Sequence, residues 1–180
     1  MIDRQRLAHI RKLIRRDKRL SDLEDRFNNL PYYQINGKEL HAEIKRIHMV
    51  RKTRQLNRKS KTFVGDITES LIDDQAHRSR LTEILMECVK IIRNLENTLE
   101  SIEGHLLLEY SELLSEIRTK SERESFIHHN ILKEYFKHIE KVERIKQVAE
   151  FVIVDIDKAG YMLKNLIEAV KLAAGRREAV

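Results

Sequence analysis

The chain has 180 residues, of which 41% are hydrophobic and 36% are charged, with five glycines, one proline and no tryptophan. This scarcity of turn-forming residues argues against a β-rich or α/β protein, whereas high charge with few helix breakers is typical of long exposed helices. The single cysteine, Cys88, excludes an internal disulfide, and no apolar run approaches the roughly 20 residues of a membrane span.

The net charge of +6 is divided unevenly along the chain. Residues 1–62 carry 18 Lys and Arg against 7 Asp and Glu, a net charge of +11, whereas residues 63–180 carry 17 against 22, a net charge of −5. Basic arms on acidic bodies commonly bind polyanions. The alternative is that the arm neutralises the acidic body of a neighbouring subunit. We favour nucleic acid, and we expect a basic arm (1–62) and a body (63–180) that also carries the oligomer interface.

The arm is predicted to be a helical hairpin. Apolar residues recur at helical spacing over residues 3–29 and again over about 38–60. Between these segments, Pro31 and the pair Asn36-Gly37 favour a break. Residues 61–66 are expected to join the arm to the body, and Asp66 with Glu69 resembles a capping box that opens the next helix.

The body is predicted to be a long antiparallel helical hairpin. Steps of three and four residues, typical of a coiled coil, join Leu81, Leu85, Cys88, Ile92, Leu95, Leu99, Ile102 and Leu106. This helix is expected to end near Arg118, and capping boxes at Thr119 or Ser121 predict a tight turn. A last helix is expected from about Lys120 to Ala174, stopped by Gly175. We also expect Tyr135 or Phe136 to pack near Gly104.

The segment FVIVDID (151–157) resembles a buried strand that ends in two metal-binding aspartates. It lies, however, inside a heptad pattern that continues on both sides, so a helix is predicted. In a helix, Asp155 and Asp157 point to different faces and cannot share a metal. A helix that is apolar nearly all round needs several neighbours. We therefore expect an oligomer interface, formed by Phe151, Val152, Ile153, Ile156, Leu163 and Leu166.

Clusters of cations are the candidate nucleic-acid-binding residues, because phosphates require many positive charges and no particular fold. They are Arg15, Arg16, Lys18, Arg19, Lys45, Arg46, Arg51, Lys52, Arg54, Arg58, Lys59 and Lys61 in the arm, with Arg118, Lys120 and Arg123 at the predicted turn. A solvated face is the alternative: we favour function for the arm cations and hold the two interpretations equal at the turn. Tyr32 and Tyr33 are candidates for base stacking, although ordinary loop packing is the interpretation we favour.

Catalytic and metal-binding patterns are weak. Glu124 with His128, and Glu134 with His138, have a spacing that zinc can use, but no second ligand cluster accompanies them. There is no nucleophile elbow, phosphate-loop glycine pattern or plausible Ser-His-Asp order. We expect no enzyme activity and no cofactor.

The C-terminal segment GYMLKNLIEAVKLAAGR (160–176) resembles the closing helix of the phage recombination mediator family (UvsY). The matching residues are Gly160, Tyr161, Leu163, Lys164, Leu166, Glu168, Leu172, Ala174 and Gly175. The chain departs from the family in its extra basic arm and in the RTKSER sequence at its bend. The resemblance implies a non-catalytic ring-like homo-oligomer that binds single-stranded DNA and helps to load a recombinase onto strands covered by single-strand-binding protein.

These patterns favour a nucleic-acid-binding helical oligomer of the cytoplasm, or of the host-cell cytoplasm if the chain is phage-encoded, with no membrane association. The alternative is a structural or adaptor protein of a virion or complex, whose basic arm binds a protein partner. A weaker alternative is an enzyme accessory subunit that uses the histidines.

Overall fold

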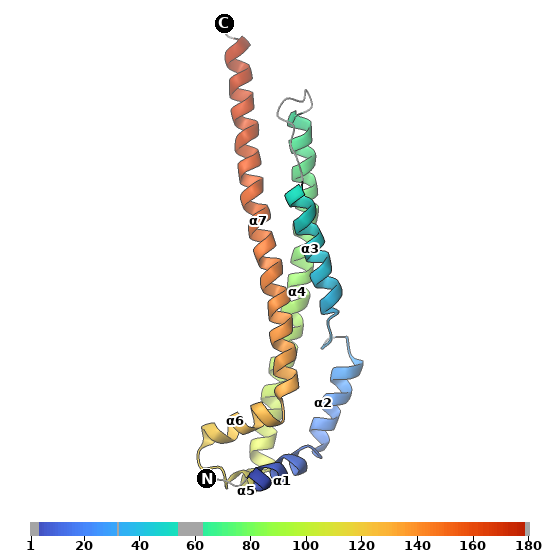
Figure 1. Ribbon diagram of the computed structural model, residues 1–180, viewed down its shortest axis with the longest axis vertical. Coiled ribbons are helices and arrows are strands. Elements are labelled where there is room, and N and C mark those ends of the chain that lie inside the picture. The colour runs from blue at the N-terminus through green and yellow to red at the C-terminus, as the bar shows by residue number, and fades with distance from the viewer. Residues whose placement is uncertain (1–3, 32, 54–62, 179–180) are drawn as a thin grey trace. The chain divides into compact units, whose positions relative to one another are not determined.

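The computed structural model describes residues 4–31, 33–53 and 63–178. Every regular element in these ranges is an α-helix, which confirms the predicted all-α class. In chain order (Figure 1) the helices are α1 (Arg4–Ile14), α2 (Lys18–Asn29), α3 (Gly37–Thr53), α4 (Phe63–Glu109), α5 (Ser111–Leu114), α6 (Lys120–Asn130) and α7 (Lys133–Glu178). None of the described helices is long and apolar enough to cross a membrane.

The chain packs into two compact units. Unit 1 comprises Met1–Asn36 and Cys88–Arg144, and unit 2 comprises Gly37–Glu87 and Ile145–Val180. Each unit combines part of the basic N-terminal region with parts of α4 and α7. The division does not follow the arm–body boundary expected at residue 62, because each half of the arm packs on a different part of the long helices.

The long helical hairpin is confirmed. Within unit 2, α4 and α7 run antiparallel, since Leu71 lies against Gly160 while Arg78, further along α4, pairs with the earlier Asp157 of α7. The segment 151–157 lies inside α7, as predicted, and its two aspartates bind different partners.

The predicted stripe of α4 is largely buried, but its register differs at two positions. Leu85 and Ile92 are only half-buried, whereas their neighbours Ile84 and Ile91 are buried. The buried positions still recur about twice per heptad, as in a coiled-coil seam. In unit 2, α3 also contributes its apolar side to the core, at Leu40, Ile44 and Ile47.

The expected single helix over residues 3–29 is wrong. It is broken at Asp17, whose carboxylate accepts hydrogen bonds from the backbone N–H groups of Arg19 and Leu20 and so caps α2. The second helix of the arm ends at Thr53 in the structure, and the part of the prediction that covers residues 54–60 lies outside the described residues. The helix that follows begins at Phe63, so Asp66 lies in its first turn and is not its cap.

The bend of the hairpin is longer than expected. The capping box at Thr119 is confirmed, because its hydroxyl accepts from the Glu122 N–H and the Glu122 carboxylate accepts from the Thr119 N–H. The incoming helix, however, ends at Glu109, and the outgoing helix is interrupted at Ile131 and Leu132. Both of these apolar side chains are buried, which offsets the loss of helical hydrogen bonds at the break.

Two further expectations about glycines are wrong. A side chain on Gly104 would meet nothing within 4 Å, so no aromatic ring packs there. Tyr135 instead meets the ring of Phe27 edge-on, at a centroid distance of 5.0 Å, and Phe136 stacks on His128 at 4.4 Å. Gly175 does not stop α7, which continues to Glu178.

Candidate nucleic-acid interface

The junction between α1 and α2 turns one carboxylate inward and leaves four cations outside. Asp17 is buried, and its Oδ2 atom accepts hydrogen bonds from His105 Nε2 at 3.0 Å and from the Tyr110 hydroxyl at 3.2 Å. Its Oδ1 atom accepts from the backbone of α2. The carboxylate is therefore enclosed by donors and is not itself exposed at the surface.

The pKa values of the junction follow from these contacts. Burial alone would raise the pKa of Asp17, but hydrogen bonds from His105, from the Arg19 N–H and from Tyr110 outweigh it and hold the pKa below its ordinary value. Burial and the charge of Asp17 raise the pKa of Tyr110. The phenol consequently keeps its proton and remains a donor to the carboxylate.

Arg15, Arg16, Lys18 and Arg19 are all exposed around this buried aspartate. None of the four side chains forms an ion pair with another described residue. We call these four residues the junction cluster. Four unpaired cations within five positions are an arrangement that attracts phosphate groups.

The junction should make unfolding sensitive to acid. Because the pKa of Asp17 is lower in the folded chain, the unfolded chain binds more protons below about pH 3.9, and stability falls as the pH is lowered through the folded pKa. We expect the Asp17→Asn variant to lose less stability than the parent between about pH 4 and pH 2. Urea unfolding at a series of pH values measures this difference, and parallel curves for the two proteins would contradict it.

The cations of α3 are divided between surface and interior. Of the candidate cations, Lys45, Arg46 and Lys52 are exposed. Arg51 is not available to a phosphate, because its side chain is 6% exposed and lies between two aspartates. Arg54, Arg58, Lys59 and Lys61 lie outside the described residues.

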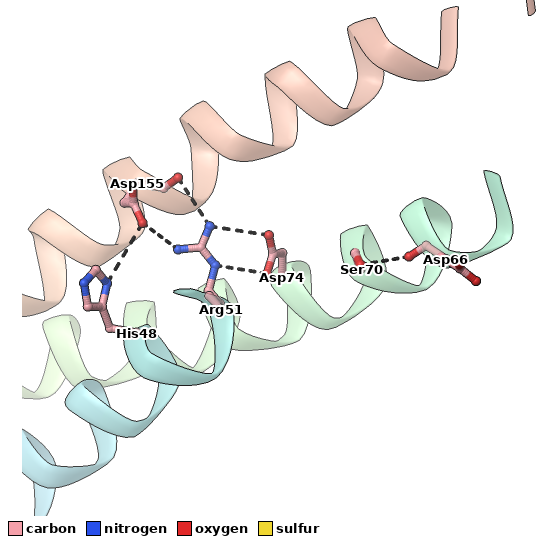
Figure 2. Close-up of polar contacts among 6 residues, drawn as sticks. All are labelled: His48, Arg51, Asp66, Ser70, Asp74 and Asp155. Carbon is pink, nitrogen blue, oxygen red and sulfur yellow. Dashed lines mark hydrogen bonds and ion pairs between the residues drawn. The ribbon is translucent and has the colours of Figure 1, made fainter. Parts of the chain in front are cut away.

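Figure 2 shows how the guanidinium of Arg51 joins three helices of unit 2. Its Nε atom donates to Asp74 of α4 at 3.0 Å, and Nη1 donates to the Asp155 carboxylate of α7 at 2.9 Å. His48 Nδ1 lies 4.0 Å from the same carboxylate. Arg51 therefore holds α3 in place and cannot also bind a phosphate. Figure 2 also shows the Ser70 hydroxyl of α4, which donates to the Asp66 carbonyl oxygen at 2.8 Å.

The cations at the bend have different surroundings. Arg118 and Lys120 are exposed, although Lys120 Nζ lies 3.7 Å from the Glu124 carboxylate. Arg123 is half-buried, and its Nε atom donates to the Ile117 carbonyl oxygen at 2.9 Å. Arg123 thus closes the loop before α6, which leaves Arg118 and Lys120 as the exposed cations of the predicted set.

Tyr33 is half-buried, and its hydroxyl lies 3.2 Å from the Thr98 hydroxyl. This contact favours the interpretation as loop packing over base stacking. Tyr32 lies outside the described residues.

The histidines considered as metal ligands have other partners. His128 Nε2 lies 2.8 Å from the Glu103 carboxylate. Burial lowers the pKa of His138, whose ring meets that of Phe27 edge-on at a centroid distance of 5.0 Å. In the described part of the chain, no group of three or more His, Cys, Asp and Glu side chains is placed to hold a metal ion.

The predicted oligomer interface contains two kinds of residue. Val152 and Ile156 are buried in unit 2, so these two belong to the core of the single chain and the prediction is wrong for them. Phe151 is 65% exposed, while Ile153, Leu163 and Leu166 are half-buried. The apolar residues of α7 cover more of its surface than α3 and α4 bury in unit 2. Part of the surface of α7 is therefore apolar and exposed.

Sequence reasoning missed Asp17, His105 and Tyr110 as supports of the junction. An aspartate directly before an apolar helical pattern is a signal for an N-cap and was available in the sequence. The pairing with two residues about ninety positions away had no local signal. Searches against family models, curated proteins and solved structures found no match to this chain.

Proposed function

We propose that this protein is a non-catalytic nucleic-acid-binding protein whose junction cluster contacts the phosphate backbone. The observation that supports this is the inward orientation of Asp17, which separates one buried anion from four outward cations. The exposed Lys45, Arg46 and Lys52 of α3 add positive charge to unit 2. Phosphate contacts of this kind give affinity without sequence preference.

A salt titration tests the proposal. Binding of a short fluorescein-labelled oligothymidylate is measured by anisotropy at several salt concentrations. Each neutralised phosphate adds about 0.7–0.9 to the magnitude of the slope of log affinity against log salt. The junction cluster is therefore expected to give a slope of about −3 or steeper. A flat response would overturn the proposal and favour the adaptor alternative, in which the basic surface binds an acidic protein partner.

Self-assembly is the second part of the proposal, and an exposed apolar stripe on α7 supports it. At about 100° per residue, Phe151, Val154, Tyr161, Met162 and Leu172 fall within about 100° of one another, on the side away from Val152 and Ile156. Lys158 and Asn165 interrupt the stripe without ending it. An exposed apolar stripe of this kind favours association, and we assign it to a second copy of the chain.

We expect the Phe151→Glu and Tyr161→Glu variants to dissociate such an oligomer, because each would place a carboxylate in a dry interface. Both residues are exposed in the single chain, so its own fold should survive. Leu108→Glu is the control, since Leu108 is also exposed but lies in unit 1, at the other end of α4. Sedimentation velocity measures the effect, and unchanged sedimentation of both α7 variants would place the interface elsewhere.

The sharper form of the proposal is a recombination mediator that prefers single strands and loads a recombinase. The similarity of residues 160–176 to the closing helix of the UvsY family supports it, together with the apolar stripe in the same part of α7. A pull-down of purified recombinase, with and without single-strand-binding protein on the DNA, tests this form separately from DNA binding.

A further inference from the structure

A polar groove in unit 1 runs between α2 and α4. It has a volume of about 470 Å³. The buried side chains of Leu23 and Ile102 form its floor. Its polar lining is Arg19, Asp22 and Arg26 from α2, and Asn97, Thr98 and Ser101 from α4.

The donors of the groove are largely unused. Neither Arg19 nor Arg26 forms a side-chain hydrogen bond or ion pair with a described residue, and the same holds for the Asn97 amide and the Ser101 hydroxyl. Thr98 is different, because its hydroxyl donates to the Asn94 carbonyl oxygen at 2.7 Å and contacts Tyr33. The groove therefore offers two guanidinium groups, an amide and a hydroxyl, with Thr98 fixed by the protein.

Arg19 and Arg26 are seven residues apart on one face of α2. Their Cα atoms are separated by about 10 Å along the helix axis, so the two side chains can reach different phosphates of one strand. Arg19 also belongs to the junction cluster, so the groove continues the positive surface along α2.

We infer that this groove is the track of a single phosphodiester strand, which enters at the junction cluster and follows α2 toward Arg26. The inference rests on the proposed function and names where the strand lies. The two arginines bind phosphate oxygens, while Asn97 and Ser101 on the opposite wall donate to the sugar and base edges. DNA and RNA share this backbone chemistry, and oligothymidylate and oligouridylate of equal length distinguish them.

Replacement of Asp22, which lies in the groove lining, tests the inference. Its carboxylate lies in the lining between the two arginines and repels a phosphate that enters the groove. The Asp22→Asn variant removes this repulsion and is expected to bind oligothymidylate about threefold to fivefold more tightly. Asp25→Asn is the matched control, because Asp25 is exposed on the same helix, outside the groove lining, and the change in net charge is identical.

Arg26→Gln provides the opposite change. It is expected to lower the salt slope by about one unit, whereas Arg144→Gln, an exposed arginine of α7 in the same unit, leaves the slope unchanged. Circular dichroism and melting temperature verify that all four variants are folded, as expected for changes at exposed side chains.

The outcomes separate the inference from the function it rests on. Steep salt dependence in the parent, with Asp22→Asn equal to Asp25→Asn and Arg26→Gln equal to Arg144→Gln, overturns the groove and leaves nucleic-acid binding intact. Absence of salt-dependent binding in the parent overturns both. Stronger binding of Asp22→Asn alone, together with a reduced slope for Arg26→Gln, is the expected result.

Discussion

Replacing Arg51 with methionine is expected to lower the free energy of unfolding by about 3–5 kcal/mol. The side chains of Arg51 and Asp74 are 6% and 5% exposed, so the change leaves the Asp74 carboxylate buried without its guanidinium. It also removes the contact to Asp155 of α7, whereas the ion pair of Glu43 with Arg80 still joins α3 to α4. Denaturant unfolding followed by circular dichroism measures the loss.

Arg78→Met is the matched control for that prediction. Arg78 forms an equally direct ion pair with Asp157, at 2.7 Å, but the two side chains are 40% and 51% exposed. A pair that is open to solvent stabilises a fold by less than about 1 kcal/mol. If the two variants lost the same stability, the buried network would not be what holds α3. The double variant Arg51→Met/Asp74→Leu should regain much of the loss, because it removes both buried charges.

Changing the whole junction cluster to glutamine is expected to weaken oligonucleotide binding by about 100-fold at physiological salt, and to reduce the salt slope by about three to four units. The four side chains are exposed, so stability should change little. The loss should be similar for oligonucleotides of different sequence, because phosphate contacts carry no sequence information. Anisotropy titrations at several salt concentrations measure both quantities.

A second quadruple variant controls for net charge. Lys133, Lys137, Lys141 and Arg144 are exposed cations at the start of α7, in the same unit as the junction cluster. Their replacement by glutamine changes the net charge by the same amount. If both quadruple variants weakened binding equally, general electrostatic attraction would explain the effect, and the junction cluster would have no special role.

The positions of the long helices could be predicted from the sequence, because their apolar spacing is local and continuous. The same pattern identified 151–157 as helix rather than strand, and the Thr119 capping box placed the start of α6. Breaks that depend on distant partners were not predictable in this way. At Asp17 the aspartate is a local N-cap signal, but the burial of its carboxylate against His105, near the end of α4, and against Tyr110, just after it, has no local signal.

The candidate nucleic-acid interface was likewise predictable in part from the sequence, and in part depends on tertiary packing. Sequence alone determined that the first 62 residues are strongly basic, and it identified the four cations of the junction cluster together with the apolar excess of α7. Only the tertiary structure decided which charges are available. Arg51 and Lys52 are adjacent cations of one basic segment. In the structure, however, Arg51 pairs with Asp74 and Asp155, whereas Lys52 is exposed at the surface. The reason is physical: net charge is a sum over residue types, whereas exposure depends on which helices pack together, and residues far apart in the chain supply those neighbours.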